Sequence, residues 1–108
     1  MVLGVLVLAA CASKPPENPD ARACLPPESA AMRDKDYNIR LAGYTHRADV
    51  FATCMTEHGY VLDANELDTR LTHFEQVKNA NVKGGDPIWA MRIQEQVLRT
   101  DPELWKRP

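Results

Sequence analysis

The sequence predicts an all-α protein, a small domain of three or four helices packed around one core. Apolar residues recur every three or four positions in three separate segments, and residues that favour helix starts or ends stand at the boundaries of those segments. No segment shows the alternation of polar and apolar residues that would indicate a strand. A chain of 108 residues is long enough for one such domain.

The first substantial helix is predicted over residues 36–58. Asp36 is a suitable N-cap, because its carboxylate can accept hydrogen bonds from the first backbone N–H groups of the helix. The apolar residues on one helical face are Tyr44, Ala48, Phe51 and Met55, with Val50 and Cys54 beside them. Gly43 destabilises the middle of this helix by about 1 kcal/mol relative to alanine. The alternative is therefore a helix that begins near Thr45. Gly59 ends the helix, since glycine readily adopts the left-handed conformation.

A second helix is predicted to follow Asp63, which is a suitable N-cap with Glu66 as its capping-box partner. Its apolar stripe consists of Leu67, Leu71, Phe74 and Val77. Residues 60–62 form a short apolar connector before this helix. Residues 79–85 form the predicted loop after it, which closes with two glycines.

A third helix is predicted to begin at Asp86 and Pro87, because an N-cap followed by proline is a favoured helix start. Its apolar stripe consists of Trp89, Ile93 and Val97, broadened by Ala90, Met91 and Leu98. On this pattern Trp89 belongs to the core. Residues 100–102 stop or kink the helix, and residues 103–105 add a last turn before a basic end.

The beginning of the chain carries a motif of its own. An apolar run over residues 2–8 leads into Leu8, Ala9, Ala10 and Cys11. This order resembles the lipobox of bacterial lipoprotein precursors. The resemblance implies cleavage between Ala10 and Cys11, a diacylglycerol thioether on the Cys11 sulfur and an acyl chain such as palmitate on the new amino terminus.

The length of the apolar run agrees with a signal peptide. A membrane-spanning helix needs roughly 20 apolar residues, whereas a signal-peptide core has about 7–15. A signal normally opens with Lys or Arg, and here only Met1 and Val2 precede Leu3 and Gly4, so we expect that the true start lies upstream or that the sequence has been trimmed. The alternative is a buried apolar strand over residues 2–10 with an unmodified Cys11.

The lipoprotein resemblance implies a division into three parts. These are a signal peptide over residues 1–10, a lipidated N-terminus and flexible tether over 11–23, and a helical periplasmic domain over 24–108. The prolines between residues 12 and 23 favour extended polyproline II, with a reach on the order of 35 Å. A short helical turn is predicted within residues 28–35. Ala12, in place of aspartate, implies sorting to the outer membrane of a Gram-negative cell, on its periplasmic face.

The three cysteines fit this location. Lipidation uses Cys11, which leaves Cys24 and Cys54 as an even pair in an oxidising compartment. We therefore predict a Cys24–Cys54 disulfide, which stabilises the fold by roughly 3–4 kcal/mol through the loop that it closes. The alternative is two unpaired buried thiols.

Two candidate sites are weighed against structural roles. His58 follows Cys54 by four residues and Met55 by three, so a soft-metal site for copper is conceivable, although a disulfide would remove the Cys54 thiolate. No cofactor is expected. In the alternative interpretation, His58 lies at the helix C-terminus and interacts favourably with the helix dipole there. His46 and His73 are expected to face solvent.

The acidic group formed by Asp63, Glu66 and Asp68 lies at a helix start, where negative charge interacts favourably with the helix dipole.

The C-terminal end offers a candidate contact for a protein partner or for the membrane interface. Trp105 stands beside Lys106 and Arg107, and an exposed tryptophan next to cations suits such a contact. The alternative is that Trp105 packs onto a neighbouring helix.

These features predict a small, lipid-anchored envelope protein without enzymatic activity that binds or stabilises another envelope component, as a pilotin-like or accessory subunit does. No glycine-rich phosphate loop and no Ser/His/Asp arrangement stands out, and a net charge of −2 argues against nucleic acid as a partner. Residues 54–60 are similar to the Cys-Met…Gly-Tyr segment of small exported bacterial proteins, which implies no known chemistry. The alternatives are a periplasmic copper-handling or stress protein, and a plasmid- or phage-borne exclusion-type surface lipoprotein.

Overall fold

The computed structural model describes residues 18–81 and 87–108, and this part of the chain is predominantly helical, as predicted. Its α-helices are α2 (Pro19–Cys24), α3 (Tyr37–Glu57), α4 (Ala64–Asn81) and α5 (Pro87–Arg99). Short 3-10 helices, η1 (Ala30–Arg33) and η2 (Pro102–Leu104), complete the helical structure. Among the described residues, no helix has both the length and the apolar character needed to cross a membrane.

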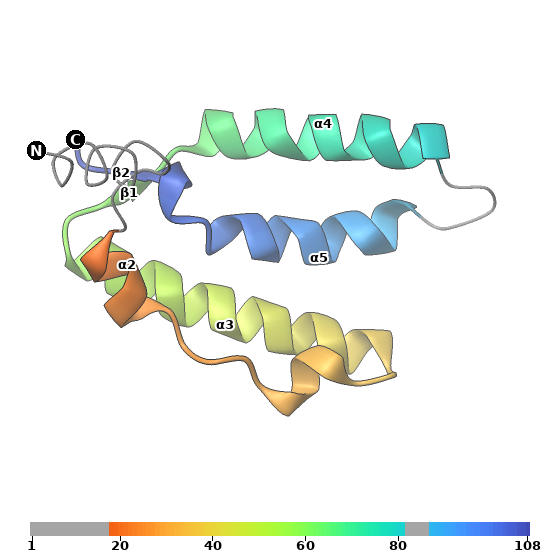
Figure 1. The fold of residues 1–108 in the computed structure, drawn as a ribbon, viewed down its shortest axis with the longest axis horizontal. Coiled ribbons are helices and arrows are strands. Elements are labelled where there is room, and N and C mark those ends of the chain that lie inside the picture. The colour runs from red at the N-terminus through yellow and green to blue at the C-terminus, as the bar shows by residue number, and fades with distance from the viewer. Residues whose placement is uncertain (1–17, 82–86) are drawn as a thin grey trace, which may run out of the picture.

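The central element is α5, which lies between α3 and α4 and packs against both (Figure 1). The segments α2 and η1 lie along the other side of α3. The predicted apolar stripe of α5 is only partly confirmed, because Trp89 and Val97 are exposed while Ile93 is half-buried. The residues expected to broaden the stripe are more buried, since Ala90 and Met91 are half-buried and Leu98 is buried.

The core lies at the end of the molecule where α2, α3 and the C-terminal segment meet. The buried residues that form it are Ala21, Cys24, Phe51, Met55, Leu98, Leu104 and Trp105. The rings of Phe51 and Trp105 meet edge to face, with their centroids 6.0 Å apart, which is a favoured aromatic geometry. The indole Nε1–H of Trp105 donates a hydrogen bond to the carbonyl oxygen of Arg99 at 2.9 Å, so its polar atom is satisfied inside the core.

A two-stranded antiparallel ribbon, which the sequence does not predict, closes this end of the molecule. Strand β1 (Val61–Leu62) pairs with β2 (Trp105–Lys106). The residues of β1 were expected to form only a connector. A strand of two residues is too short to show an alternating pattern in the sequence. It forms only because the tertiary fold brings residues 105–106 beside residues 61–62.

The start and the end of α3 confirm two sequence predictions. The Asp36 carboxylate accepts hydrogen bonds from the backbone N–H groups of Asn38 at 2.8 Å and Ile39 at 3.4 Å. Gly59 follows the helix with a φ of 88°, the left-handed conformation that glycine adopts without steric cost. The alternative start near Thr45 is wrong, because the helix continues through Gly43.

The start of α4 confirms one half of the predicted capping box. The Asp63 carboxylate accepts a hydrogen bond from the backbone N–H of Glu66 at 3.0 Å. The Glu66 carboxylate, however, accepts from Arg70 Nε at 3.0 Å, and the Asp63 N–H donates to the Leu104 carbonyl oxygen at 2.7 Å. The C-terminal segment therefore occupies the place that the Glu66 side chain was expected to take.

The boundaries of two predicted segments are wrong. The folded part begins before Cys24, because Asn18 caps α2 by accepting from the N–H groups of Asp20 at 2.9 Å and Ala21 at 3.2 Å. Pro19 is tolerated as the first helical residue, since that position needs no N–H donor. The expected tether therefore ends before residue 18, and its remaining residues lie outside the described part. The predicted loop over 79–85 is wrong for 79–81, which belong to α4, while 82–86 are not described.

Gly43 lies at a close approach of α3 and η1. A Cβ atom at this position would be 2.9 Å from the Met32 backbone nitrogen and 3.0 Å from the Ala31 Cβ. The glycine therefore lets the backbone of η1 lie directly on the helix, and this close packing also buries the Met32 side chain.

We expect the substitution Gly43→Ala to destabilise the fold by about 1–3 kcal/mol, because the added methyl group overpacks a contact with rigid backbone. Helix propensity alone predicts the opposite sign, a gain of about 1 kcal/mol. Urea denaturation followed by circular dichroism measures the difference. His46→Ala, an exposed change on the same helix, is the control and should stay within about 0.5 kcal/mol of wild type. A Gly43→Ala variant more stable than wild type would contradict the close approach.

Candidate functional site

The predicted disulfide is present between the last residue of α2 and the last turns of α3. Cys24 and Cys54 have their sulfur atoms 2.05 Å apart and their Cα atoms 5.4 Å apart. Cys24 is buried and Cys54 is half-buried. The bond therefore fixes α2 onto α3 beside the core.

His58 lies next to this disulfide, at the C-cap position of α3. Its ligand nitrogen and the sulfur atoms of Cys24 and Cys54 all lie within 4.8 Å of one another. We call these three residues the cysteine–histidine cluster. The four-residue spacing of Cys54 and His58 places both on one face of the helix, whereas only the tertiary fold brings Cys24 to them.

Asp20 supports the cluster from α2. One of its carboxylate oxygens lies 3.6 Å from His58 Nδ1. The other accepts hydrogen bonds from the Tyr60 hydroxyl at 3.0 Å and from Arg107 Nη2 at 3.3 Å. The Arg107 guanidinium in turn lies over the Tyr60 ring, 4.4 Å from its centroid. These contacts hold the Asp20 carboxylate beside the imidazole.

The other metal-ligand candidate of the sequence, Met55, has a different position. Its side chain is fully buried in the core with Phe51. Met55 follows Cys54 directly, so the two side chains leave the helix in directions about 100° apart. The structure therefore uses Met55 for packing.

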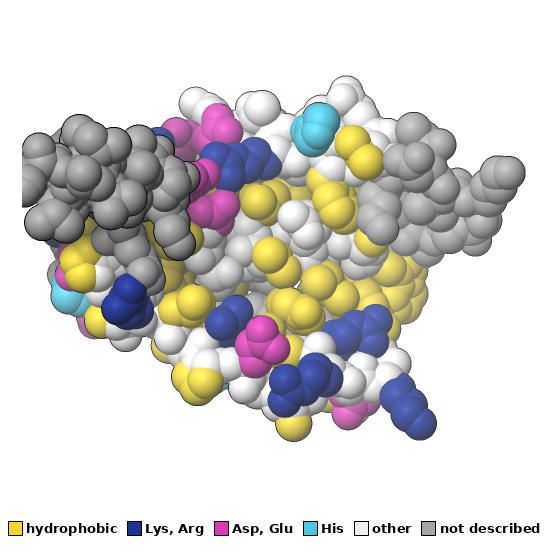
Figure 2. All heavy atoms as spheres, viewed as in Figure 1, with side chains coloured by type: hydrophobic (Ala, Val, Ile, Leu, Met, Phe, Trp, Pro, Cys, Tyr) yellow, Lys and Arg dark blue, Asp and Glu magenta, His cyan; other side chains and the backbone are white. Residues whose placement is uncertain are grey.

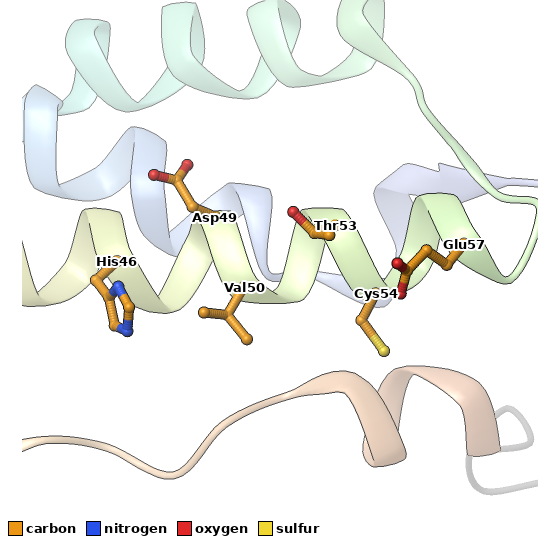
Figure 3. A pocket seen from close by; sticks show the side chains of 6 residues that line it. All are labelled: His46, Asp49, Val50, Thr53, Cys54 and Glu57. Atoms are coloured by element: carbon orange, nitrogen blue, oxygen red, sulfur yellow. The ribbon is translucent and has the colours of Figure 1, made fainter.

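His46 and His73 are exposed, as the sequence predicts. Figure 3 shows His46, Val50 and Cys54 on the side of α3 that faces the segment between α2 and η1. A shallow pocket there is lined by His46, Asp49, Val50, Thr53, Cys54 and Glu57. Asp49 points away in this view and pairs with Arg99 Nη2 at 3.2 Å, so the acidic groups of this pocket do not form a paired carboxylate site.

The positions of the two tryptophans correct the sequence interpretation. Trp105 is only 6% exposed and packs against Phe51 of α3, so the alternative of packing onto a neighbouring helix is confirmed and the candidate contact of its ring with a partner is wrong. Trp89, which was expected in the core, is 44% exposed. Its ring meets Tyr37 edge to face at a centroid distance of 4.0 Å, and its carbonyl oxygen accepts a hydrogen bond from the Tyr37 hydroxyl at 2.9 Å. Lys106 and Arg107 are exposed, although Arg107 is paired with Asp20.

A mainly apolar groove of about 560 Å³ lies between α4 and α5. The residues that line this α4–α5 groove are Thr69, Arg70, His73, Phe74, Val77, Gln94 and Leu98. Hydrophobic side chains gather on this face of the molecule, over α5 and between it and α4 (Figure 2). No pattern in the sequence identifies the groove. The spacing of apolar residues along a helix is the same whether the adjacent helix covers the apolar face completely or leaves part of it open.

Arg70 borders the groove at its charged end. Its guanidinium bonds to the carboxylates of Glu66 at 3.0 Å, Asp101 at 3.0 Å and Glu103 at 3.2 Å. The hydrogen bonds from Glu66 and Glu103 are the main causes that raise the pKa of Arg70 above its ordinary value. Of the predicted acidic group at the start of α4, Asp63 is therefore an N-cap and Glu66 belongs to an ion-pair network, and both roles are structural.

The predicted lipidation and cleavage residues, Cys11 and Ala10, lie outside the described residues. Comparison of the chain with protein-family models, with curated proteins and with solved structures finds no match in any of the three.

We expect the double substitution Cys24→Ala/Cys54→Ala to lower the free energy of unfolding by about 3–4 kcal/mol, because it removes a cross-link between residues 30 positions apart. Urea denaturation of the oxidised wild type and the double variant measures the change. Cys11→Ser, which keeps the pair, is the control. Equal denaturation midpoints for the double variant and the control would show that the bond does not stabilise the fold.

Proposed function

We propose that this protein is a lipid-anchored component of the bacterial envelope that binds another envelope protein and has no enzymatic activity. The observation that carries the proposal is the lipobox Leu8 to Cys11, followed at a short distance by a stable helical module. The lipid would attach the module to the periplasmic face of the outer membrane.

The short distance between the lipid site and the module supports a role close to the membrane. Asn18, which caps the first described helix, follows Cys11 by seven positions. Even a fully extended segment of this length spans only about 25 Å. The folded part would therefore lie within a few nanometres of the bilayer, where its partner would be another membrane-associated or periplasmic protein.

The α4–α5 groove is the proposed binding site. It is lined by Phe74, Val77 and Leu98 among others, and apolar grooves between helices accept the apolar face of an amphipathic helix. The helix α2 lies at the end of the module where β1 and β2 pair (Figure 1). The α4 residues that line the groove, from Thr69 to Val77, follow the first turn of α4 and extend toward its C-terminal end. A lipid attached near α2 would leave the groove accessible.

The anchor is tested by the substitution Cys11→Ser in the protein expressed from its natural reading frame. We expect the variant to lose the lipid, because serine cannot form the thioether, and to move from the membrane fraction to an unprocessed or mis-sorted form. Mass spectrometry of the purified protein and fractionation of the cells measure both effects. If the variant still fractionates with the membrane as wild type does, the anchor is excluded.

The groove is tested by Val77→Asp, with Val50→Asp as the matched control. The two valines are 45% and 40% exposed, but only Val77 lines the groove. A photoreactive residue at position 94 should crosslink to a specific envelope protein in cells. We expect Val77→Asp to weaken this crosslink about tenfold or more, since a charge in an apolar contact costs over 1.4 kcal/mol. Val50→Asp should leave it unchanged, and equal loss in both variants would contradict the proposed site.

A further inference from the structure

The cysteine–histidine cluster has the composition and spacing of a soft-metal site. Two sulfur atoms and an imidazole nitrogen lie within 4.8 Å of one another. Ligand atoms around a tetrahedral zinc ion are separated by about 3.5–4 Å, so small side-chain rotations are enough to place all three on one ion. Two thiolates with an imidazole are the ligands that zinc and monovalent copper prefer.

The disulfide closes this site, because an oxidised cysteine pair offers no thiolate. We propose that the cysteine–histidine cluster is a redox-gated metal site, closed while Cys24 and Cys54 are bonded and able to bind one thiophilic metal ion after their reduction. A dithiol reductant supplies the two electrons and two protons that convert the disulfide into two thiols, and the reductant becomes a disulfide. Metal binding then displaces both thiol protons. Three protein ligands leave the fourth position of a tetrahedral ion open to solvent.

Asp20 makes His58 suitable as a ligand. Its carboxylate oxygen lies 3.6 Å from His58 Nδ1, and a carboxylate beside one ring nitrogen of a metal-binding histidine orients the ring. Because Tyr60 and Arg107 hold the second Asp20 oxygen, the orientation does not depend on the disulfide.

Non-covalent contacts keep the ligands together when the bond is reduced. Ala21 of α2 is buried in the core, and the Asp20 contacts tie the same helix to Tyr60 and Arg107. On the other side of Cys24, the Arg47 Nε–H donates to the Pro26 carbonyl oxygen at 2.9 Å. A metal ion would then reconnect α2 and α3 at the position of the former bond.

The site is open to solvent on the side of His58 only. Cys24 is buried, Cys54 is half-buried and the His58 side chain is 45% exposed. An ion or a small reductant can therefore approach from the His58 side, while the core covers the opposite side. This inference does not depend on the lipid anchor or on the α4–α5 groove.

The test is zinc binding to the full-length Cys11→Ser chain, in which Cys24 and Cys54 are the only remaining thiols. Competition with a chromogenic chelator measures the affinity of the reduced and of the oxidised protein, and Co²⁺ reports thiolate coordination through its charge-transfer absorption. We expect one equivalent of Zn²⁺ to bind to the reduced chain and at least about a hundredfold weaker binding to the oxidised chain, which equals a difference of about 2.7 kcal/mol.

Variants identify the ligands. His58→Ala should weaken Zn²⁺ binding by the reduced chain about tenfold or more, whereas His46→Ala, on the same helix, should not. If reduction unfolds the chain, recovery of helical circular dichroism on addition of Zn²⁺ supports the site. Absence of zinc binding by the reduced chain, folded or not, overturns the proposal. Equal zinc affinity of the oxidised and reduced chains, or of His58→Ala and wild type, also overturns it.

Discussion

The covalent bond between Cys24 and Cys54 is the constraint on which the N-terminal half of the fold depends. The helix α2 has only six residues, and a helix this short is not stable without tertiary contacts. The disulfide places it on α3, where Ala21 and Cys24 can be buried against the core. The contacts of Asp20 with His58 and Tyr60 attach α2 at the same place without a covalent bond. The cross-link and the core therefore support each other.

The second organising element is α5, which connects the two sides of the molecule. It packs against α3 on one side and α4 on the other, and Leu98 is its buried residue in the core. The chain then turns through η2, where Leu104 and Trp105 enter the core and Arg70 holds Asp101 and Glu103. Leu104 and Trp105 near the end of the chain are therefore part of the core, and Leu98 belongs both to this core and to the lining of the α4–α5 groove.

The two sites have different chemistry and lie on different elements. The α4–α5 groove is apolar and offers contact area, whereas the cysteine–histidine cluster offers ligand atoms that depend on the oxidation state of one bond. A protein that is held near a membrane can use the first without the second. If both operate, the metal site reports the redox state of the compartment at the joint between α2 and α3, since that joint is where the bond opens.

The sequence by itself determined the features that depend on local interactions. The caps at Asp36 and Asp63, the glycine end of α3 and the proline start of α5 were predicted because each is a contact within one turn of helix. The disulfide pairing followed from the cysteine count and the predicted compartment. Only the tertiary structure decided the features that join distant segments. These include the burial of Trp105 in place of Trp89, the β1–β2 pairing, the start of the fold at Asn18 and the position of Asp20 beside His58. Helical periodicity shows which residues share a face, but the partner of that face and the depth of its burial depend on how the helices pack.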